Sequence, residues 1–309
     1  MSKKLSCKLL VVILIVCGIE NNLFGRDIFN SSENYRFFTS VSNDESNTIV
    51  LPKKKSFIDS FNELPRRKKA IYFNVGAVAT TMVIGAASWD YYSSAFEFRN
   101  EGWFDPDTNY GGSDKLGHAF GGYALTSVYN SIYKKFGYSH DQAILYGALS
   151  SWSLLTLVEV GDGFSKDYGF SMQDEAFNTA GVVLGYFRQR YPRLKEIFDY
   201  RLEWVPSDDF KDGNADPFTD YSGQKNIIAL KPAGILKSEN PLLKAIDLDI
   251  GFYTRGYEDN YHTKRRYIFY GVGLNMSYIL EQLTGHKAGG IFDYIQIPFT
   301  YIPFKTELD

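Results

Sequence analysis

Three apolar helical stretches of this chain each carry two polar side chains that stand three or four residues apart. The three pairs are Asp114 with His118, Glu159 with Asp162, and Asp174 with Asn178. Residues at this spacing lie on one face of a helix. Carboxylates and a histidine among Leu, Val, Gly and Ala are unfavourable unless they pair, bind a ligand or face water. The fold therefore has to bring these side chains to water, to a ligand or to one another.

The N-terminus has the features of an export signal. Basic residues within the first eight positions precede an apolar run, residues 9–19, that is too short to span a bilayer. We expect cleavage after Gly25, which makes residues 1–25 a signal peptide and places the protein in the cell envelope, on the periplasmic face or on a membrane. An uncleaved signal anchor is the main alternative.

Both cysteines of the chain, Cys7 and Cys17, precede Gly25. Cleavage after Gly25 therefore leaves no cysteine for a disulfide or for thiol catalysis. Cys17 stands at the end of the apolar run, where the acylated cysteine of a lipoprotein is found, so lipidation is a second alternative. The preceding residues, Ile15 and Val16, differ from the small residue that lipidation normally requires.

Composition narrows the class of partner. The 309 residues carry a formal net charge of −3, which gives no electrostatic basis for nucleic-acid binding. Aromatic residues make up 17% of the chain. This content is typical of membrane interfaces and exposed strands, and a bias in base composition would also produce it. We expect a membrane lipid or another envelope component as the partner, whereas the sequence identifies neither a cofactor nor an oligomeric state.

A long charge-free stretch follows a polar leader. Residues 26–69 are rich in Asn, Ser and Lys and end in a basic run, which predicts a mobile or lightly structured segment. Residues 70–89 lack charge over roughly the length of a transmembrane helix, and Trp89 is typical of the interface at its end. A wholly buried helix in a soluble bundle is the alternative.

Three further helices are predicted, each beginning at a serine that can cap it: Ser113, Ser139 and Ser171. Gln142 and Asp174 follow the second and third serine by three residues and complete capping-box patterns. We expect the helices to end near residues 136, 163 and 190. Their short connections favour antiparallel neighbours. Residues 70–192 thus predict an antiparallel helical bundle associated with the membrane.

The last part of the chain, residues 193–309, has a different character. Its beginning, up to about residue 218, is polar and predicts a linker with short helical pieces. Strands are expected where Ile, Tyr, Phe and Val accumulate, at 225–232, 245–257, 265–280 and 292–304. The clearest alternation, at 246–251, places Asp247, Asp249 and Gly251 on one face and Ile246, Leu248 and Ile250 on the other. The fold class is therefore mainly α, with a small β-rich C-terminal region.

Antiparallel packing brings the three polar pairs to one end of the bundle. Asp114 and His118 begin one helix, Glu159 ends the next, and Asp174 begins the last. Each also has an ordinary structural explanation. The aspartates favour the positive end of a helix dipole, His118 can be a hydrogen-bonded core histidine, and Glu159 can pair with Lys115.

Two classes of function fit this polar end of the bundle. The first is a non-enzymatic envelope role, in which the cluster binds a lipid, a wall precursor or a partner protein. The second is an enzyme that uses a metal or acid–base chemistry on a lipid-linked or phosphate-bearing envelope substrate. The sequence specifies no particular metal. The candidate catalytic residues are His118, Glu159, Asp114 and Asp174.

Glycines continue the polar stripe along the last helix. Gly181 and Gly185 form a small-xxx-small face that lets another helix approach closely. Gly121 and Gly122, beside His118, can serve the same purpose. We interpret these glycines as structural.

The order of these motifs resembles two families. DKxxH, then ExxD, then SxxDxxxNxxGxxxG is similar to the YfiM-like family of uncharacterised, predicted periplasmic lipoproteins and to the broader VanZ-like pattern of membrane proteins. The resemblance covers about residues 70–190, and the segment after Asp220 resembles the strand-rich tail of longer YfiM-like members. It implies an envelope location and supplies no reaction. The matching positions are Asp114, Lys115, His118, Glu159, Asp162, Ser171, Asp174, Asn178, Gly181 and Gly185.

Overall fold

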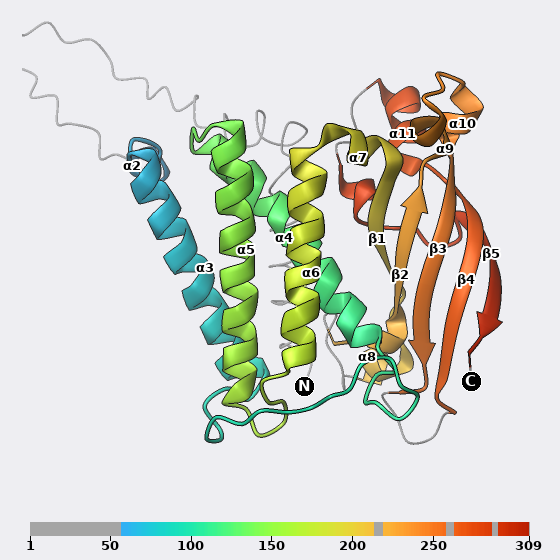
Figure 1. Cartoon of the computed structure of the whole chain (residues 1–309). Helices are drawn as coiled ribbons and strands as arrows, with labels where there is room; N and C mark the ends of the chain where they lie inside the picture. The colour runs from blue at the N-terminus through green and yellow to red at the C-terminus, as the bar shows by residue number, and fades with distance from the viewer. Residues whose placement is uncertain (1–56, 213–218, 258–262, 286–289, 309) are drawn as a thin grey trace, which may run out of the picture.

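The computed structural model describes residues 57–212, 219–257, 263–285 and 290–308. A layer of long helices lies on one side of the molecule and an antiparallel sheet on the other (Figure 1). The predicted signal peptide, Cys17 and most of the polar leader lie outside the described residues. The end of that leader is helical, because it contains α2 (Phe57–Asn62) and the first turn of α3. The long helices are α3 (Arg66–Ser88), α4 (Ser113–Lys135), α5 (His140–Gly163) and α6 (Met172–Arg190).

Consecutive long helices run in opposite directions (Figure 1). Helix α4 packs against both α5 and α6, and α5 also contacts α6 and α3. The start of α4, the end of α5 and the start of α6 therefore share one end of the helical layer, as the sequence predicted.

Glycines allow α4 and α6 to approach at backbone distance. A Cβ on Gly122 would lie 2.6 Å from the carbonyl oxygen of Asn178, and one on Gly185 would lie 2.9 Å from that of Tyr123. A Cβ on Gly181 would overlap the carbonyl group of Ala119. The predicted close-packing role is confirmed for these three glycines. It is wrong for Gly121, which has open space beside it.

The helix caps agree with the sequence in two cases out of three. Ser139 and Gln142 form the predicted capping box of α5. Ser171 Oγ accepts a hydrogen bond of 3.2 Å from the backbone N–H of Asp174 and so caps α6. The second half of the predicted capping box is not formed there, because the Asp174 carboxylate pairs with Lys115 instead. The prediction of Ser113 as the N-cap of α4 is wrong, because Gly112 holds that position with a φ of 89°. The ring of Phe104 fills the space where a side chain on Gly112 would lie, so the turn requires glycine.

The C-terminal part folds into one five-stranded antiparallel sheet in the order of the sequence. It is more extensive than predicted, because β1 lies in the segment expected to be a linker. The predicted strand at 265–280 ends at Leu274, where Asn275 caps a helix instead. The strand predicted at 292–304 begins only at Tyr301, because residues 291–293 form a 3-10 turn. The strands are β1 (Phe198–Trp204), β2 (Gln224–Leu230), β3 (Ile246–Arg255), β4 (Arg265–Leu274) and β5 (Tyr301–Glu307). Helix α7 (Pro192–Ile197) leads from α6 into β1, and short helices lie between later strands: α8 (Asp208–Asp212), α9 (Pro232–Leu236), α10 (Pro241–Ala245) and α11 (Met276–Thr284).

Over residues 247–250, strand β3 buries its polar side chains and exposes its apolar ones, the reverse of an ordinary half-buried strand. Asp247 and Asp249 are 0% and 1% exposed, whereas Leu248 and Ile250 are each 43% exposed. Arg201 of β1 explains the burial of Asp247, because its Nη1 lies 2.7 Å from Asp247 Oδ2. Buried charges are tolerated when they pair in this way. The sheet therefore has an ionic interior on this face.

Asp199 of β1 connects this interior to the helices. Its carboxylate oxygens lie 2.6 Å from Arg201 Nη2, 2.6 Å from Arg188 Nη2 of α6 and 2.7 Å from Lys231 Nζ. On the opposite face of β1, Tyr200 packs against Tyr123 of α4. The helical layer and the sheet are thus joined by both ionic and aromatic contacts.

Candidate functional site

Lys115 of α4 lies at the centre of a buried group of carboxylates. Its side chain is 1% exposed, and its Nζ lies 2.7 Å from Asp114 Oδ2, 2.7 Å from Asp174 Oδ1 and 2.8 Å from Glu101 Oε2. Burial acts to lower the pKa of Lys115, but the three carboxylates outweigh it and raise that pKa above its ordinary value. Lys115 is therefore a permanent cation inside the protein.

His118, one turn further along α4, lies at the centre of a second group. Its Nδ1 is 3.4 Å from Glu159 Oε1 and 3.2 Å from Asn178 Oδ1, and its Nε2 is 3.8 Å from Asp174 Oδ1. Asn178 Nδ2 also donates a hydrogen bond of 3.4 Å to Glu159 Oε1. Burial acts to lower the pKa of His118, but Asp174, Glu159 and Asp114 raise it to about 9.

Asp174 belongs to both groups through the same oxygen. The ligand atoms of His118, Glu159 and Asp174 all lie within 4.8 Å of one another, and so do those of Glu101, Asp114 and Asp174. The Lys115 ammonium group contacts Glu101, Asp114 and Asp174. Lys115 therefore supplies a positive charge to the carboxylates around it. The set of His118, Glu159 and Asp174 gains a positive charge of its own only when His118 is protonated.

Acidic groups outnumber cations in this cluster. Burial and Asp174 raise the pKa of Glu101 to about 7, which shows that the site already resists a further negative charge. Lys115 and His118 are the two basic groups in contact with it. The carboxyl groups that act on them are Glu101, Asp114, Glu159, Asp162 and Asp174. Such an excess of buried carboxylates favours a bound cation or a bound proton.

The structure brings most of the predicted site residues together. Asp162 lies at the edge of the cluster, beside Tyr91 and within electrostatic reach of His118. Ser171, by contrast, only caps α6. The predicted pairing of Glu159 with Lys115 is wrong, because Glu159 contacts His118 and Lys115 pairs with Asp114, Asp174 and Glu101. The residues in direct mutual contact are Asp114, Lys115, His118, Glu159, Asp174 and Asn178.

Two members of the site were not predicted from the sequence. Glu101 lies in the loop between α3 and α4, where no periodicity marks it. Tyr221 comes from the C-terminal part and lies within electrostatic reach of Asp114, Asp174 and Glu101. Its ring centroid lies 4.7 Å from that of Tyr110. The one sequence signal was the position of Tyr221 inside the segment that resembles the YfiM-like tail.

A protein-family model described as "Predicted periplasmic lipoprotein (DUF2279)" matches residues 100–190. The matched segment contains Glu101 and the site residues of α4, α5 and α6. Its description agrees with the exported, envelope-associated location predicted from the N-terminus, and it carries neither the YfiM-like nor the VanZ-like name. No curated protein and no solved structure gives a significant match.

Proposed function

We propose that this chain is a cell-envelope protein whose buried cluster binds a divalent cation, with His118, Glu159 and Asp174 as ligands. The observation that carries this proposal is the convergence of one imidazole and two carboxylates from three helices, with ligand atoms within 4.8 Å of one another. A mixed nitrogen and oxygen set of this kind suits Zn²⁺, Mn²⁺ or Fe²⁺.

A proton and a metal ion compete for this position. His118 has to be neutral to bind a metal, whereas its raised pKa of about 9 favours the protonated form when no metal is bound. Metal binding therefore releases a proton and strengthens as the pH rises. Asn178, which contacts both His118 and Glu159, is placed to orient these two ligands.

The burial of the cluster favours an ion over a bulky ligand. The side chains of Lys115, Glu159 and Asp174 are 1%, 2% and 7% exposed, whereas that of His118 is 20% exposed. A lipid head group, a wall precursor or a partner protein can therefore approach the cluster only at its partly exposed members, of which His118 is the most exposed and Glu101 is 13% exposed.

This exposed edge of His118 also favours a second candidate function. A cation held by His118, Glu159 and Asp174 would lie next to this exposed edge, where a phosphate-bearing envelope substrate can reach it, and it would polarise the phosphate group. If no cation is bound, His118 and Glu159 would themselves be the groups that exchange protons with a water or hydroxyl. Either form would be an enzyme that acts on a lipid-linked or phosphate-bearing envelope substrate.

Metal content tests the cation proposal. The full-length protein is extracted from membranes in detergent, and bound metals are quantified by mass spectrometry for the natural chain, for His118→Gln and for His140→Gln. His140 is an exposed histidine at the start of α5 and serves as the matched control. We expect one bound ion per chain, retained in His140→Gln and lost in His118→Gln, with a melting temperature that falls on chelation. A folded natural protein that binds no Zn²⁺ or Mn²⁺ at a pH of about 8 would show a purely structural ion-pair network.

The enzyme is tested separately. The metal-loaded protein is incubated with lipid-linked phosphate esters and diphosphates, and phosphate release is compared with that of the His118→Gln variant. A metal-bound protein with no turnover on these substrates would leave cation binding in place and remove the second candidate.

A further inference from the structure

Helices α3 and α5 expose several large apolar side chains. Helix α3 lies at the edge of the molecule, on the side of the helices away from the sheet (Figure 1). Its outward residues and those of α5 form the surface that we call the apolar flank. This flank consists of Ile71, Tyr72, Val75 and Val83 of α3 and of Leu145, Tyr146, Leu149 and Trp152 of α5, each of which is at least 39% exposed.

The two helices of the flank have the length and composition of membrane-spanning helices. Helix α3 has 23 residues, which corresponds to about 35 Å, compared with about 30 Å for the hydrocarbon layer of a bilayer. Only 11% of the most apolar 18-residue stretch of α3 is buried inside the protein, and the corresponding share for α5 is 33%. The core helix of a soluble protein would be mostly buried. The low burial of α3 therefore argues against its being the core helix of a soluble bundle.

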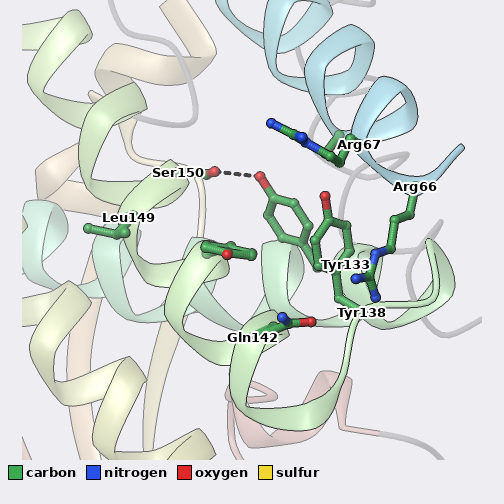
Figure 2. Close-up of a pocket in the computed structure, with 9 residues that line it drawn as sticks. Arg66, Arg67, Tyr133, Tyr138, Gln142, Leu149 and Ser150 are labelled. Atoms are coloured by element: carbon green, nitrogen blue, oxygen red, sulfur yellow. Dashed lines mark hydrogen bonds between the residues drawn. The ribbon is translucent and has the colours of Figure 1, made fainter.

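A hollow of about 460 Å³ lies at one end of the apolar flank. Its wall combines two arginines from the first turn of α3 with tyrosines and amide or hydroxyl groups from α4, α5 and the turn between them (Figure 2). Arg66 lies over the ring of Tyr138, with Cζ 5.1 Å from the ring centroid. Tyr133 Oη lies 2.8 Å from Ser150 Oγ. The residues that line the hollow are Arg66, Arg67, Ala70, Tyr133, Tyr138, Gln142, Tyr146, Leu149 and Ser150.

Positive charge gathers at this end of the helices. Arg66 and Arg67 are followed in α3 by Lys68 and Lys69, and α4 ends at the same level with two further lysines. Asp141, the acidic residue in the first turn of α5, is paired with Arg190 at 2.9 Å. The carboxylates of the candidate metal site lie at the opposite end of α4. The hollow is therefore a cationic, hydrogen-bonding recess beside an apolar surface.

We propose that the apolar flank inserts into a lipid bilayer and that the hollow binds the anionic phosphate head group of a phospholipid. The guanidinium groups of Arg66 and Arg67 supply the positive charge and the donors for the phosphate oxygens. Tyr133 and Tyr138 occupy the interfacial level at which amphipathic rings are favoured. The acyl chains lie along the flank that begins at Leu149 and Tyr146. This site is separate from the cation site and does not depend on it.

A bilayer accounts for this surface better than a protein partner does. The match between helix length and hydrocarbon thickness, and the confinement of the basic residues of α3 to its first turn, follow directly from insertion at the level of anionic head groups. A second copy of the chain or another protein would need neither feature.

The preference of the protein for anionic lipid tests the role of the hollow. The full-length protein is reconstituted with vesicles of phosphatidylcholine alone or of phosphatidylcholine with phosphatidylglycerol, and partitioning is measured by flotation. The apolar residues 9–19 contribute equally to both mixtures, so the ratio of the two partition coefficients is the readout. Each basic residue near an anionic leaflet raises partitioning by about fivefold. Replacing Arg66 and Arg67 with Gln should therefore lower the ratio by up to about 30-fold.

The matched control removes the same charge elsewhere. Lys264 and Arg265 are exposed neighbours at the start of β4, and the Lys264→Gln, Arg265→Gln protein should keep the ratio of the natural chain. Equal ratios for the two double variants would overturn the head-group site. Stabilisation of the protein by soluble glycerol phosphate, without any lipid preference, would show a soluble anion site and would also overturn it.

Quenching by brominated lipids tests insertion of the flank. Trp152 lies on the exposed surface of α5, whereas Trp204 lies on β1 with its Nε1 bonded to Asp220. We expect brominated acyl chains to quench tryptophan emission in the natural chain and in Trp204→Phe, and quenching to fall in Trp152→Phe. An unchanged quenching in Trp152→Phe would overturn the proposal that the flank inserts into a bilayer. Cross-linking that shows the flank covered by a second copy of the chain would also overturn it.

Discussion

Lys115 and Asp174 face each other from adjacent helices, with Nζ of the lysine 2.7 Å from Oδ1 of the aspartate. Because Asp174 lies in the first turn of α6 and Lys115 in the first turn of α4, this pair fixes the two helix starts together. The same carboxylate oxygen lies 3.8 Å from His118 Nε2. Asp174 thus couples the internal cation of the protein to the candidate metal site, and a change at either basic residue reaches the other through it.

Replacing Lys115 with Gln should strongly destabilise the protein. The substitution leaves Asp114, Asp174 and Glu101 buried without their common cation, and the loss of one partner of a buried ion pair costs about 3–5 kcal/mol. Chemical denaturation of the full-length protein measures the change. Lys68→Gln, which removes an exposed lysine, is the control and should alter stability little. A change in Lys115→Gln as small as in the control would mean that the carboxylates are protonated rather than paired.

His118 and Glu159 should be energetically coupled. A double-mutant cycle with His118→Ala and Glu159→Gln should give a coupling energy of about 0.5–3 kcal/mol, because Nδ1 of the histidine lies 3.4 Å from Oε1 of the glutamate. The second substitution should cost less than the first, since the first already leaves its partner unsatisfied. Thermal unfolding supplies the stabilities, and metal content is measured on the same four proteins. Additive stability changes would contradict a shared network, and coupling in stability without a change in metal content would show a structural polar core.

The helices and most strands could be predicted from the sequence because their signals are local. Ser139 with Gln142 marks a helix start within four residues, and apolar periodicity marks the rest. β1 could not be predicted in this way. Its buried residues include Asp199 and Arg201, which composition assigns to the surface. They are buried because Arg188 of α6 and Asp247 of β3 complete their ion pairs.

The candidate site shows the same limit. Helical spacing indicated His118, Glu159 and Asp174, because each lies on a periodic apolar helix. Glu101 lies in an irregular loop, and only the fold brings it within 2.8 Å of Lys115. The antiparallel order of the helices was enough to predict that the three pairs converge. Only the three-dimensional positions show that some carboxylates surround Lys115 and others surround His118.

Replacing Gly181 with Ala should destabilise the packing of α4 against α6. The new methyl group would overlap the carbonyl group of Ala119, and overpacking of this kind costs about 1–3 kcal/mol. Gly121→Ala is the matched control, because Gly121 is also within a helix but has open space beside it. The control should be neutral or more stable by about 0.5–1 kcal/mol, since alanine favours helix over glycine. Unfolding in denaturant compares the two proteins, and an equal effect of both substitutions would contradict the close approach at Gly181.

The stability of the sheet should depend on pH through Asp249. Its side chain is buried, and within the described part of the chain its carboxylate oxygens have no hydrogen-bond partner. Burial and the neighbouring Asp247 raise the pKa of Asp249 from 3.8 to about 7, although Arg201 acts in the opposite direction. The folded state therefore holds this proton more tightly than the unfolded state does. The contribution to stability is complete below pH 4 and is lost as the pH rises through about 7.

Asp249→Asn removes this titration while keeping the size of the side chain. Near pH 4 the variant and the natural protein should have similar free energies of unfolding, because both carry a neutral group at this position. At a pH of about 8 the variant should be the more stable by a few kcal/mol, since one pKa unit corresponds to about 1.4 kcal/mol. Denaturant unfolding at a series of pH values measures both proteins, with the exposed Asp141→Asn as the control that should follow the natural curve. Parallel curves for Asp249→Asn and the natural chain would show that Asp249 is ionised in the folded protein, with Arg201 as its compensating charge.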